Sequence, residues 1–263
     1  MSLEAHLRER RSAGAKLLVP YVTGGLDDAW PDVVRAVVDA GADAVEIGIP
    51  FSDPVMDGPV IQEASQRALA RGATPTSILD EARSLDVDVP LVVMTYCNLV
   101  LHAGCARFAA ALHDSGIAGA ILPDLPLHEI GEWADAADDA GVETVLLAAP
   151  NSTDERIAAI AERSRGFLYC VSLLGITGVR SELAERATDI ARRVKHATDL
   201  PALLGVGISS PDQAVAGSAV ADGVVVGSAL VARLLEGAGP EGAHDLVSGF
   251  RTALDDAAAE EAP

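Results

Sequence analysis

The sequence predicts an α/β fold, a (β/α)8 TIM barrel, in a single domain over residues 1–263 with an extra N-terminal helix. Three observations support this prediction. Apolar strand-like runs alternate with amphipathic helix-like stretches along the whole chain. Most of these runs are continuously apolar and bounded by Gly or Pro, as parallel strands covered on both faces are. The length of 263 residues also matches one barrel of roughly 250 residues.

The predicted strands are residues 16–23, 44–49, 91–97, 119–123, 144–149, 167–172, 202–206 and 223–226. The predicted helices are residues 3–13, 30–40, 61–71, 77–85, 106–115, 127–140, 152–165, 182–196, 211–216 and 228–236, with a last one in 236–263. Ser152 and Glu155 form a capping-box pattern, Gly166 reads as the stop of the same helix, and Ser210 reads as an N-cap. A doubly wound open sheet is the alternative fold, but the sequence lacks an early GxGxxG and has one or two strands too many.

The charge balance narrows the class of protein. A net charge of −20 argues against nucleic-acid binding, which requires clustered Lys and Arg. Lys16 and Lys195 are the only lysines, and the acidic residues are dispersed over the predicted helices. Such a surface is typical of a protein kept soluble in high salt, so we expect a halophilic source. An ordinary acidic cytoplasmic enzyme is the alternative.

Location and metal content are predicted from what the sequence lacks. It has no apolar run of about 18 residues and no signal-like N-terminus, so we expect a soluble, cytoplasmic protein. Cys97, Cys105 and Cys170 cannot all pair with one another, and we expect reduced thiols. No metal-binding spacing occurs among the Cys and His residues, so no metal site is predicted.

A glutamate stands inside the second predicted strand. Glu46 shares its face of that strand with small residues only, so it should point into restricted space. No Lys or Arg occurs between Arg35 and Arg67 to neutralise it locally, and burial should raise its pKa toward neutrality. Asp57 lies in the proline-rich loop that follows. The two acids could perform acid–base chemistry, or be a core Glu held by a distant Arg and an Asp that caps the next helix.

Glycine-rich turns follow the seventh and eighth predicted strands. Gly207 lies in the first turn, Gly227 and Ser228 lie in the second, and each turn leads into a helix. Backbone N–H groups and helix dipoles would converge there, which predicts a phosphate site. The glycines could instead serve only to make tight turns. The loop after the sixth strand carries Thr177 and Gly178; it could cover a ligand, and Gly178 could join the phosphate cradle.

Elimination narrows the reaction class. Schiff-base chemistry needs a Lys at a strand end, whereas Lys16 begins a strand and Lys195 ends a helix. Metal-assisted enolisation lacks ligands, and no Ser/His nucleophile elbow occurs. The remaining chemistry is acid–base work by Glu46 and Asp57 on a phosphorylated small molecule that supplies its own electron sink.

The loop motifs resemble those of one known family. In order along the chain they are PYVT at 20–23, EIGIPFSDPVMDGP at 46–59, MTYCNL at 94–99, LPDLP at 122–126, APNST at 149–153, GITG at 175–178, GVGIS at 205–209 and GS at 227–228. This set is similar to the α subunit of tryptophan synthase over essentially the whole chain. The resemblance implies a cofactor-independent retro-aldol cleavage of indole-3-glycerol phosphate to indole and glyceraldehyde 3-phosphate, at the end of tryptophan biosynthesis.

The resemblance also implies a role for each matching residue. Glu46 would be the general acid/base, Asp57 would accept a hydrogen bond from the indole N–H, and Tyr169 would lie near Glu46. Tyr21 and Leu99 would wall the indole, and Thr177 would belong to a closing loop.

The resemblance further implies a partner. A tryptophan synthase β subunit, which carries the pyridoxal phosphate, would join this chain in an αββα heterotetramer and receive indole through a tunnel. Asn98, Asp124 and Pro126 would face it, together with the loop of residues 53–57. This chain itself would bind no pyridoxal phosphate.

Two alternatives stay open from the sequence. One is another phosphate-binding barrel, an isomerase or synthase acting on a sugar phosphate. The other is a regulatory barrel subunit without activity of its own.

Overall fold

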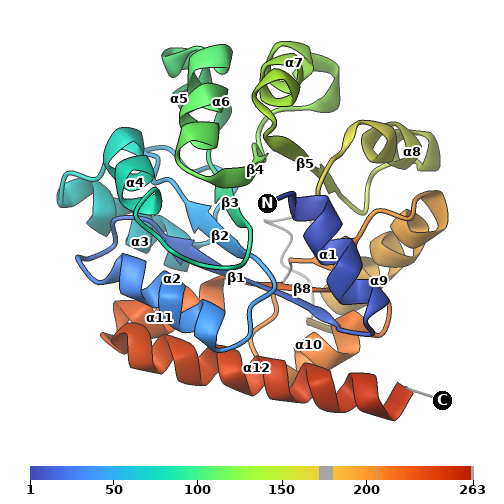
Figure 1. Ribbon diagram of the computed structural model, residues 1–263. Coiled ribbons are helices and arrows are strands. Elements are labelled where there is room, and N and C mark those ends of the chain that lie inside the picture. Colours follow the sequence, from blue (N-terminus) through green and yellow to red (C-terminus); the bar gives the residue numbers. More distant parts are fainter. Residues whose placement is uncertain (172–179, 206, 262–263) are drawn as a thin grey trace.

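The chain folds as a closed barrel of parallel strands surrounded by helices (Figure 1). The computed structural model describes residues 1–171, 180–205 and 207–261, with side chains omitted for 180–187 and 261. Over these residues eight strands pair in sequence order and β8 closes onto β1. The strands are β1 (Leu17–Thr23), β2 (Val45–Gly48), β3 (Leu91–Met94), β4 (Ile117–Ile121), β5 (Glu143–Ala148), β6 (Leu168–Cys170), β7 (Ala202–Leu204) and β8 (Gly223–Val226). The predicted barrel is confirmed.

The helices form the outer layer. They are α1 (Leu3–Ser12), α2 (Trp30–Asp39), α3 (Pro59–Ala70), α4 (Pro75–Ala82), α5 (Cys97–Ala103), α6 (Cys105–Asp114), α7 (Gly131–Ala140), α8 (Asp154–Arg163), α9 (Arg180–Ala197), α10 (Pro211–Ser218), α11 (Ser228–Leu235) and α12 (Gly239–Glu261), with a 3-10 turn at Leu127–Glu129. The long α12 packs against α2, α10 and α11 (Figure 1). The predicted extra helix is α1, which precedes β1.

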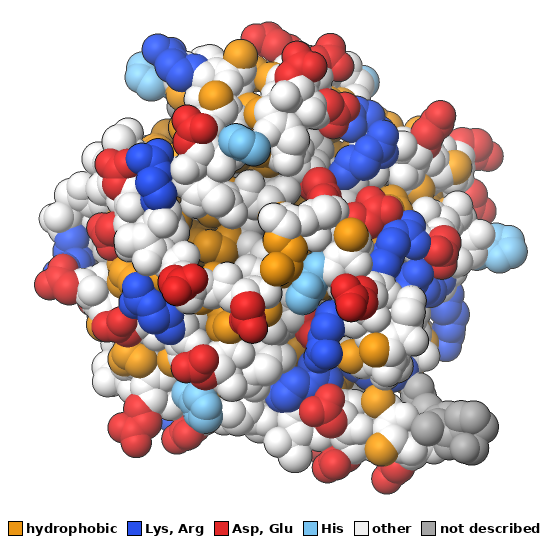
Figure 2. Space-filling model, viewed as in Figure 1, with side chains coloured by type: hydrophobic (Ala, Val, Ile, Leu, Met, Phe, Trp, Pro, Cys, Tyr) orange, Lys and Arg blue, Asp and Glu red, His pale blue; other side chains and the backbone are white. Residues whose placement is uncertain are grey.

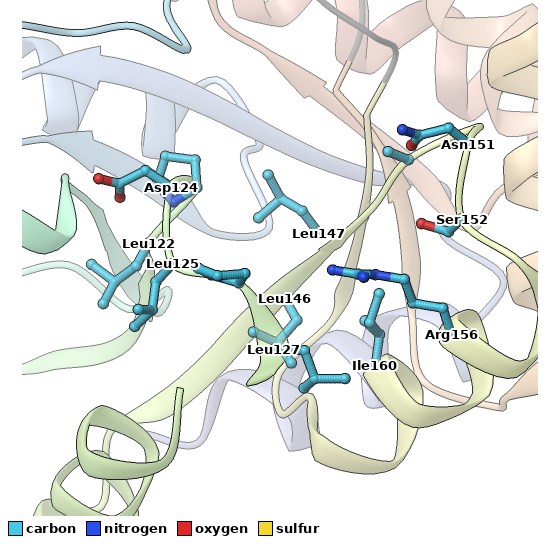
Figure 3. A pocket seen from close by; sticks show the side chains of 13 residues that line it. Leu122, Asp124, Leu125, Leu127, Leu146, Leu147, Asn151, Ser152, Arg156 and Ile160 are labelled. Atoms are coloured by element: carbon cyan, nitrogen blue, oxygen red, sulfur yellow. The ribbon is translucent and has the colours of Figure 1, made fainter. Parts of the chain in front are cut away.

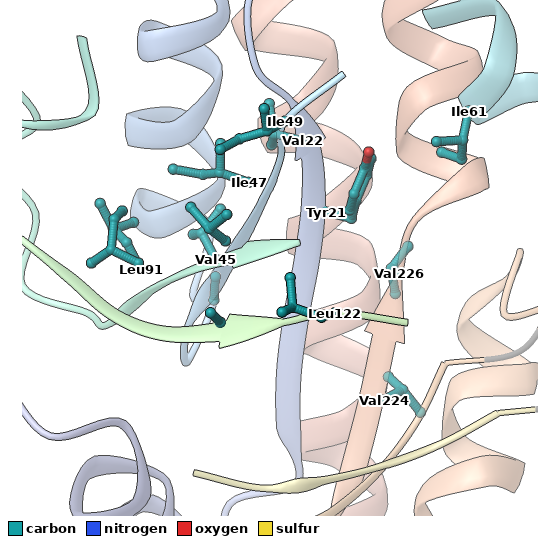
Figure 4. Close-up of a cluster of buried hydrophobic side chains, with 14 of the residues drawn as sticks. Tyr21, Val22, Val45, Ile47, Ile49, Ile61, Leu91, Leu122, Val224 and Val226 are labelled. Atoms are coloured by element: carbon teal, nitrogen blue, oxygen red, sulfur yellow. The ribbon is translucent and has the colours of Figure 1, made fainter. Parts of the chain in front are cut away.

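Two apolar clusters hold these layers together. One lies between the strands and the helices, and includes the outward side chains Val45 and Ile47 of β2 (Figure 4). The other lies inside the barrel and includes Val19, Val92 and Val225. Leu3 and Leu7 of α1 belong to the inner cluster and are fully buried, so α1 closes one end of the barrel.

Two aspartates connect helices and strands at the end of the barrel that α1 closes. Asp43, which is 1% exposed, accepts hydrogen bonds from Arg10 Nε (2.6 Å), Arg251 Nη1 (3.2 Å) and the amide of Leu18 (2.8 Å). It therefore joins α1, β1 and α12. Asp222 similarly pairs with Lys195 of α9 and accepts from the amide of Ala202 in β7. Because each carboxylate binds groups from several elements, each fixes chain segments that are far apart in sequence.

The region after β3 differs from the prediction. The predicted strand 91–97 ends at Met94, and Cys97 begins α5, which the sequence analysis did not predict. Tyr96 is the extended residue before this helix, and Val100 is the buried residue of the helix. The helix has only seven residues, so its apolar pattern is too short to distinguish from a strand. Asn98 consequently lies on a helix and not in a loop.

Three predicted helix ends also differ from the structure. Thr153, not Ser152, caps α8, because its hydroxyl accepts from the amide of Arg156. The same helix ends at Arg163, and Gly166 lies beyond it with φ 78°. A Cβ on Gly166 would lie 2.6 Å from the side chain of Leu3, so this glycine leaves room for α1 and does not stop α8. The predicted helix 127–140 is a 3-10 turn followed by α7, whereas the N-cap at Ser210 is confirmed.

The surface carries interspersed charges of both signs with acids in excess (Figure 2). Within the described part of the chain, no helix is both long and apolar enough to cross a membrane. Cys97, Cys105 and Cys170 are all free thiols. The described residues also contain no group of three or more Asp, Glu, His or Cys side chains that could hold a metal ion.

Candidate active site

A cavity of about 240 Å³ opens at the carboxyl ends of the strands, the end opposite α1. Parallel (β/α)8 barrels place their sites there, because the loops from all strands meet at that end. Of the residues that the sequence predicts for the site, seven line this one cavity: Tyr21, Glu46, Asp57, Tyr169, Gly207, Gly227 and Ser228. Side chains of Ile61, Met94 and Leu147 add an apolar wall.

Glu46 is the most deeply buried acid of the cavity. On β2 it lies beside Tyr21 of β1 and Val92 of β3, and its residue is 1% exposed. Neither carboxyl oxygen has a hydrogen-bond partner. Burial, with a smaller contribution from the negative charge of Asp57, raises the pKa of Glu46 to about 8. The sequence prediction of a desolvated acid on a face of small residues is confirmed, and the group can give or take a proton near neutral pH.

Asp57 lies in the loop between β2 and α3 and is partly buried. Burial raises its pKa to about 6, while a hydrogen bond with the Tyr96 hydroxyl acts in the opposite direction. The backbone of Gly58, not the side chain of Asp57, occupies the N-cap position of α3. The capping role considered for Asp57 is therefore wrong, and its side chain bonds with the Tyr96 hydroxyl instead.

Tyr96, for which the sequence pattern predicts no role, contacts the loop that carries Asp57. Its hydroxyl accepts a hydrogen bond from the amide of Met56 at 3.0 Å, and its ring stacks on Phe51 with centroids 5.1 Å apart. Tyr96 thereby contacts residues on both sides of Asp53 and reaches Asp57 itself. Its position within the motif at 94–99 was visible in the sequence. The contact across 40 residues was not, because it depends on the barrel.

Two tyrosines flank Glu46, and each lies against a glycine. A Cβ on Gly48 would collide with the hydroxyl of Tyr21, and one on Gly205 would collide with the ring of Tyr169. Glycine is therefore required at both positions to leave room for the rings. The ring of Tyr169 also contacts Phe167 edge-on at 5.9 Å. Burial raises the pKa of both phenols, so both hydroxyls stay protonated at neutral pH and remain donors.

The glycine-rich turns after β7 and β8 end at the same cavity. Gly207 has φ 60°, a conformation that favours glycine, and Gly227 occupies the N-cap position of α11, which begins at Ser228. Bare amide groups of a helix N-terminus suit an anion, which supports the predicted phosphate position. Gly178 and Thr177 lie outside the residues that the structure describes.

Among the described residues, four others that the sequence predicts for the site or the partner surface are absent from the lining of this cavity: Leu99, Asn98, Asp124 and Pro126. Leu99 lies on α5, partly buried against the apolar cluster that includes Tyr21, and its contact with indole stays a prediction. Asn98 lies on α5, and Asp124 and Pro126 lie in the loop after β4. Asp124 accepts hydrogen bonds from the amide (2.9 Å) and thiol (3.1 Å) of Cys97, which ties the loop after β4 to the start of α5.

The raised pKa of Glu46 predicts a pH-dependent stability. Its folded pKa of about 8 lies above its ordinary value of 4.5, so the folded protein holds a proton that the unfolded chain releases between these pH values. Stability should therefore fall as pH rises through that window. Glu46→Gln removes the titration, so we expect its melting temperature to exceed that of the unmodified chain at pH 9, with the difference shrinking toward pH 5. Thermal melts at both pH values measure this, and an equal difference at both would contradict it.

Comparisons with known proteins agree with this geometry. The family model for the tryptophan synthase alpha chain matches residues 7–257. The tryptophan synthase alpha chain of Streptomyces coelicolor is 43% identical over 242 residues, covering 88% of each chain. A crystal structure of M. tuberculosis tryptophan synthase has a TM-score of 0.87 at 35% identity, and covers 96% of this chain and 97% of that chain. The Legionella pneumophila tryptophan synthase subunit alpha has a TM-score of 0.88 at 31% identity, covering 97% and 99%. This chain therefore belongs to the tryptophan synthase alpha chain family.

Proposed function

We propose that this chain is a carbon–carbon lyase that cleaves indole-3-glycerol phosphate to indole and glyceraldehyde 3-phosphate, without a cofactor. The observation that supports this best is the pair of carboxyl groups in one cavity, with pKa values of about 8 for Glu46 and about 6 for Asp57. Two acids with separated pKa values can hold opposite protonation states at neutral pH. Glu46 is then mostly protonated and Asp57 mostly ionised.

That difference in pKa supports the following roles for the two acids. Protonated Glu46 donates its proton to C3 of the indole ring, and ionised Asp57 accepts a hydrogen bond from the indole N–H, which stabilises the resulting cation. The Glu46 carboxylate then removes the proton of the side-chain hydroxyl next to the ring. The bond between C3 and the glycerol carbon breaks, its electrons return to the ring, and the aldehyde forms. Since the protonated indole is the electron sink, neither Lys nor a metal ion is needed.

The residues that line the cavity suit a substrate with an indole ring at one end and a phosphate at the other. Ile61, Met94 and Leu147 give an apolar wall for an indole ring, with Tyr21 and Tyr169 beside Glu46. The amides near Gly207, Gly227 and Ser228 would bind the phosphate at the other end. We further propose that Gly178 and Thr177 act from the loop after β6, as the resemblance implies.

The assembly is also part of the proposal. We place a tryptophan synthase β subunit, the carrier of pyridoxal phosphate, over Asn98, Asp124 and Pro126, in an αββα heterotetramer located in the cytoplasm. The hydrogen bonds from Cys97 to Asp124 support this placement of the partner. They hold the loop after β4 next to α5, the helix that carries Asn98.

Indole release from indole-3-glycerol phosphate by the purified chain, with and without the β subunit, tests the proposal. We expect slow release by the chain alone and faster release with the partner. No indole under either condition would contradict it and would favour a different phosphate-binding barrel. Activity only with the partner would favour the regulatory alternative, and Glu46→Gln in this chain would then leave the rate of the complex unchanged.

The halophilic source is also a proposal. With a net charge of −20, self-repulsion should destabilise the fold at low salt. The screening length falls from about 10 Å at 0.1 M salt to about 3 Å at 1 M. We expect the melting temperature to rise between about 0.1 M and 1 M KCl, with NaCl giving the same rise. A flat or falling melting temperature in both salts would contradict a halophilic protein.

A further inference from the structure

A second cavity, of about 440 Å³, lies beside the active-site cavity. It opens between the carboxyl ends of β4 and β5 and the first turn of α8 (Figure 3). Leu125, Leu127, Leu146 and Ile160 supply apolar walls, and Pro123 and Leu147 line both cavities. The two cavities therefore share a wall, and the second has the size of a receptor for side chains or a small ligand.

Arg156 gives this cavity its positive charge. Its side chain extends from α8 over the cavity, toward Leu147 (Figure 3). Among the described residues, its guanidinium has neither a hydrogen bond nor an ion pair. The nearby arginines differ, since Arg163 pairs with Asp138 at 3.0 Å and Arg193 with Asp154 at 2.7 Å. In a chain with 39 acidic and 19 basic residues, an unpaired arginine over a cavity with both polar and apolar lining is a place for an anionic group from outside.

The opposite side of the cavity does not neutralise Arg156. The carboxylate of Asp124 binds the amide and thiol of Cys97 and lies on the far side of the cavity from the guanidinium (Figure 3). Asp154, two residues before Arg156, is paired with Arg193. Arg156 thus keeps its charge available although acids stand near it.

The position of the cavity indicates what covers it. Asp124 and Pro126, which line it, are also two of the three residues at which we place the β subunit. A partner seated on those residues must lie over the cavity as well, because they form part of its rim. The same surface therefore offers a recess with apolar walls and one unpaired positive group.

We infer that this cavity receives an acidic side chain of the β subunit, which pairs with Arg156, and an apolar neighbour that packs on the leucines. This inference rests on the proposed function. A carboxylate can bind a guanidinium through two parallel hydrogen bonds, and the partner, seated over the exposed Arg156, would shield the pair from water and salt. Arg156 then determines the affinity for the partner without touching the substrate.

The test compares binding of the β subunit, by isothermal titration calorimetry, to the unmodified chain and to three variants. Arg156→Gln removes the charge, and Arg156→Glu reverses it. Arg233→Gln on α11 is the matched control, since Arg233 is also exposed and has no ion pair among the described residues. We expect the dissociation constant to rise about 10-fold in Arg156→Gln and further in Arg156→Glu, and to stay unchanged in Arg233→Gln. Indole release by the isolated variants should match the unmodified chain.

The outcomes separate this inference from the proposed function. If the unmodified chain binds the β subunit and both Arg156 variants bind equally well, the inference is overturned while the proposed function stands. Equal weakening by Arg233→Gln would also overturn it, because the effect would then follow net charge. If the unmodified chain does not bind the β subunit, the proposed partner fails, and this inference fails with it.

Discussion

Replacing Glu46 by Gln should lower the turnover of indole-3-glycerol phosphate by a factor of at least about 10². Gln keeps the size and polarity of the side chain but cannot donate a proton to the ring or take one from the hydroxyl. Asp57→Asn should cause a loss of the same order, because an amide presents no negative charge to the developing cation. Both losses should appear in kcat. Initial rates of indole release measure them directly.

A matched control is available on α3. Glu63 is an exposed glutamate paired with Arg67, and Glu63→Gln should leave turnover unchanged. Competition by inorganic phosphate should persist in the Glu46 and Asp57 variants, since neither side chain belongs to the glycine-rich turns. Unchanged turnover in both variants would refute the acid–base mechanism. Lost phosphate competition would mean that the substitutions had disrupted the site as a whole.

Replacing Asp43 by Ala should lower the free energy of unfolding by about 3 kcal/mol, the lower range for breaking a buried ion pair. The substitution leaves Arg251, whose side chain is 11% exposed, without its buried partner, and it leaves the amide of Leu18 without an acceptor. Arg10 also loses its partner, and its raised pKa should return toward the ordinary value. Urea unfolding at neutral pH measures the change.

The control for that experiment is Asp32→Ala. Asp32 pairs with Arg35 on the surface of α2, with both side chains largely exposed, and such pairs contribute less than about 1 kcal/mol. Asp43 lies at the end of the barrel away from the active-site cavity, so the specific activity of the folded Asp43→Ala protein should be unchanged. A loss of stability no larger than that of Asp32→Ala would contradict the role assigned to Asp43.

The sequence was sufficient wherever a local pattern determines the structure. Continuous apolar runs identified the strands, because parallel strands are buried on both faces. The alternation around Glu46 placed this acid on the inner face of β2, and the small residues on that face indicated that it would be desolvated. The glycine-rich turns could be placed on one cavity because parallel strands bring their carboxyl ends together.

The parts that failed depend on contacts between distant segments. Tyr96 reaches the loop of Asp57 only once β2 and β3 are paired. The role of Gly166 depends on Leu3, more than 160 residues earlier in the chain. The strand predicted over 91–97 ends at Met94, and the unpredicted helix α5 begins at Cys97, whose amide and thiol bind Asp124 of the next loop. The local hydrophobic periodicity of a segment carries no information about its contacts with distant segments, so the sequence alone could not show these contacts.

The closure of one barrel end by α1 has a consequence for folding during synthesis on the ribosome. Leu3 and Leu7 emerge long before the residues that bury them, which include Gly166 and Phe167 of the segment entering β6. This helix cannot reach its final position until the roughly 160 residues between Leu3 and Gly166 have been translated, about ten to thirty seconds at typical elongation rates. During that interval its apolar face is exposed to the cell. Nascent chains that end before about residue 170 should therefore bind chaperones through α1, and those that extend beyond it should release them.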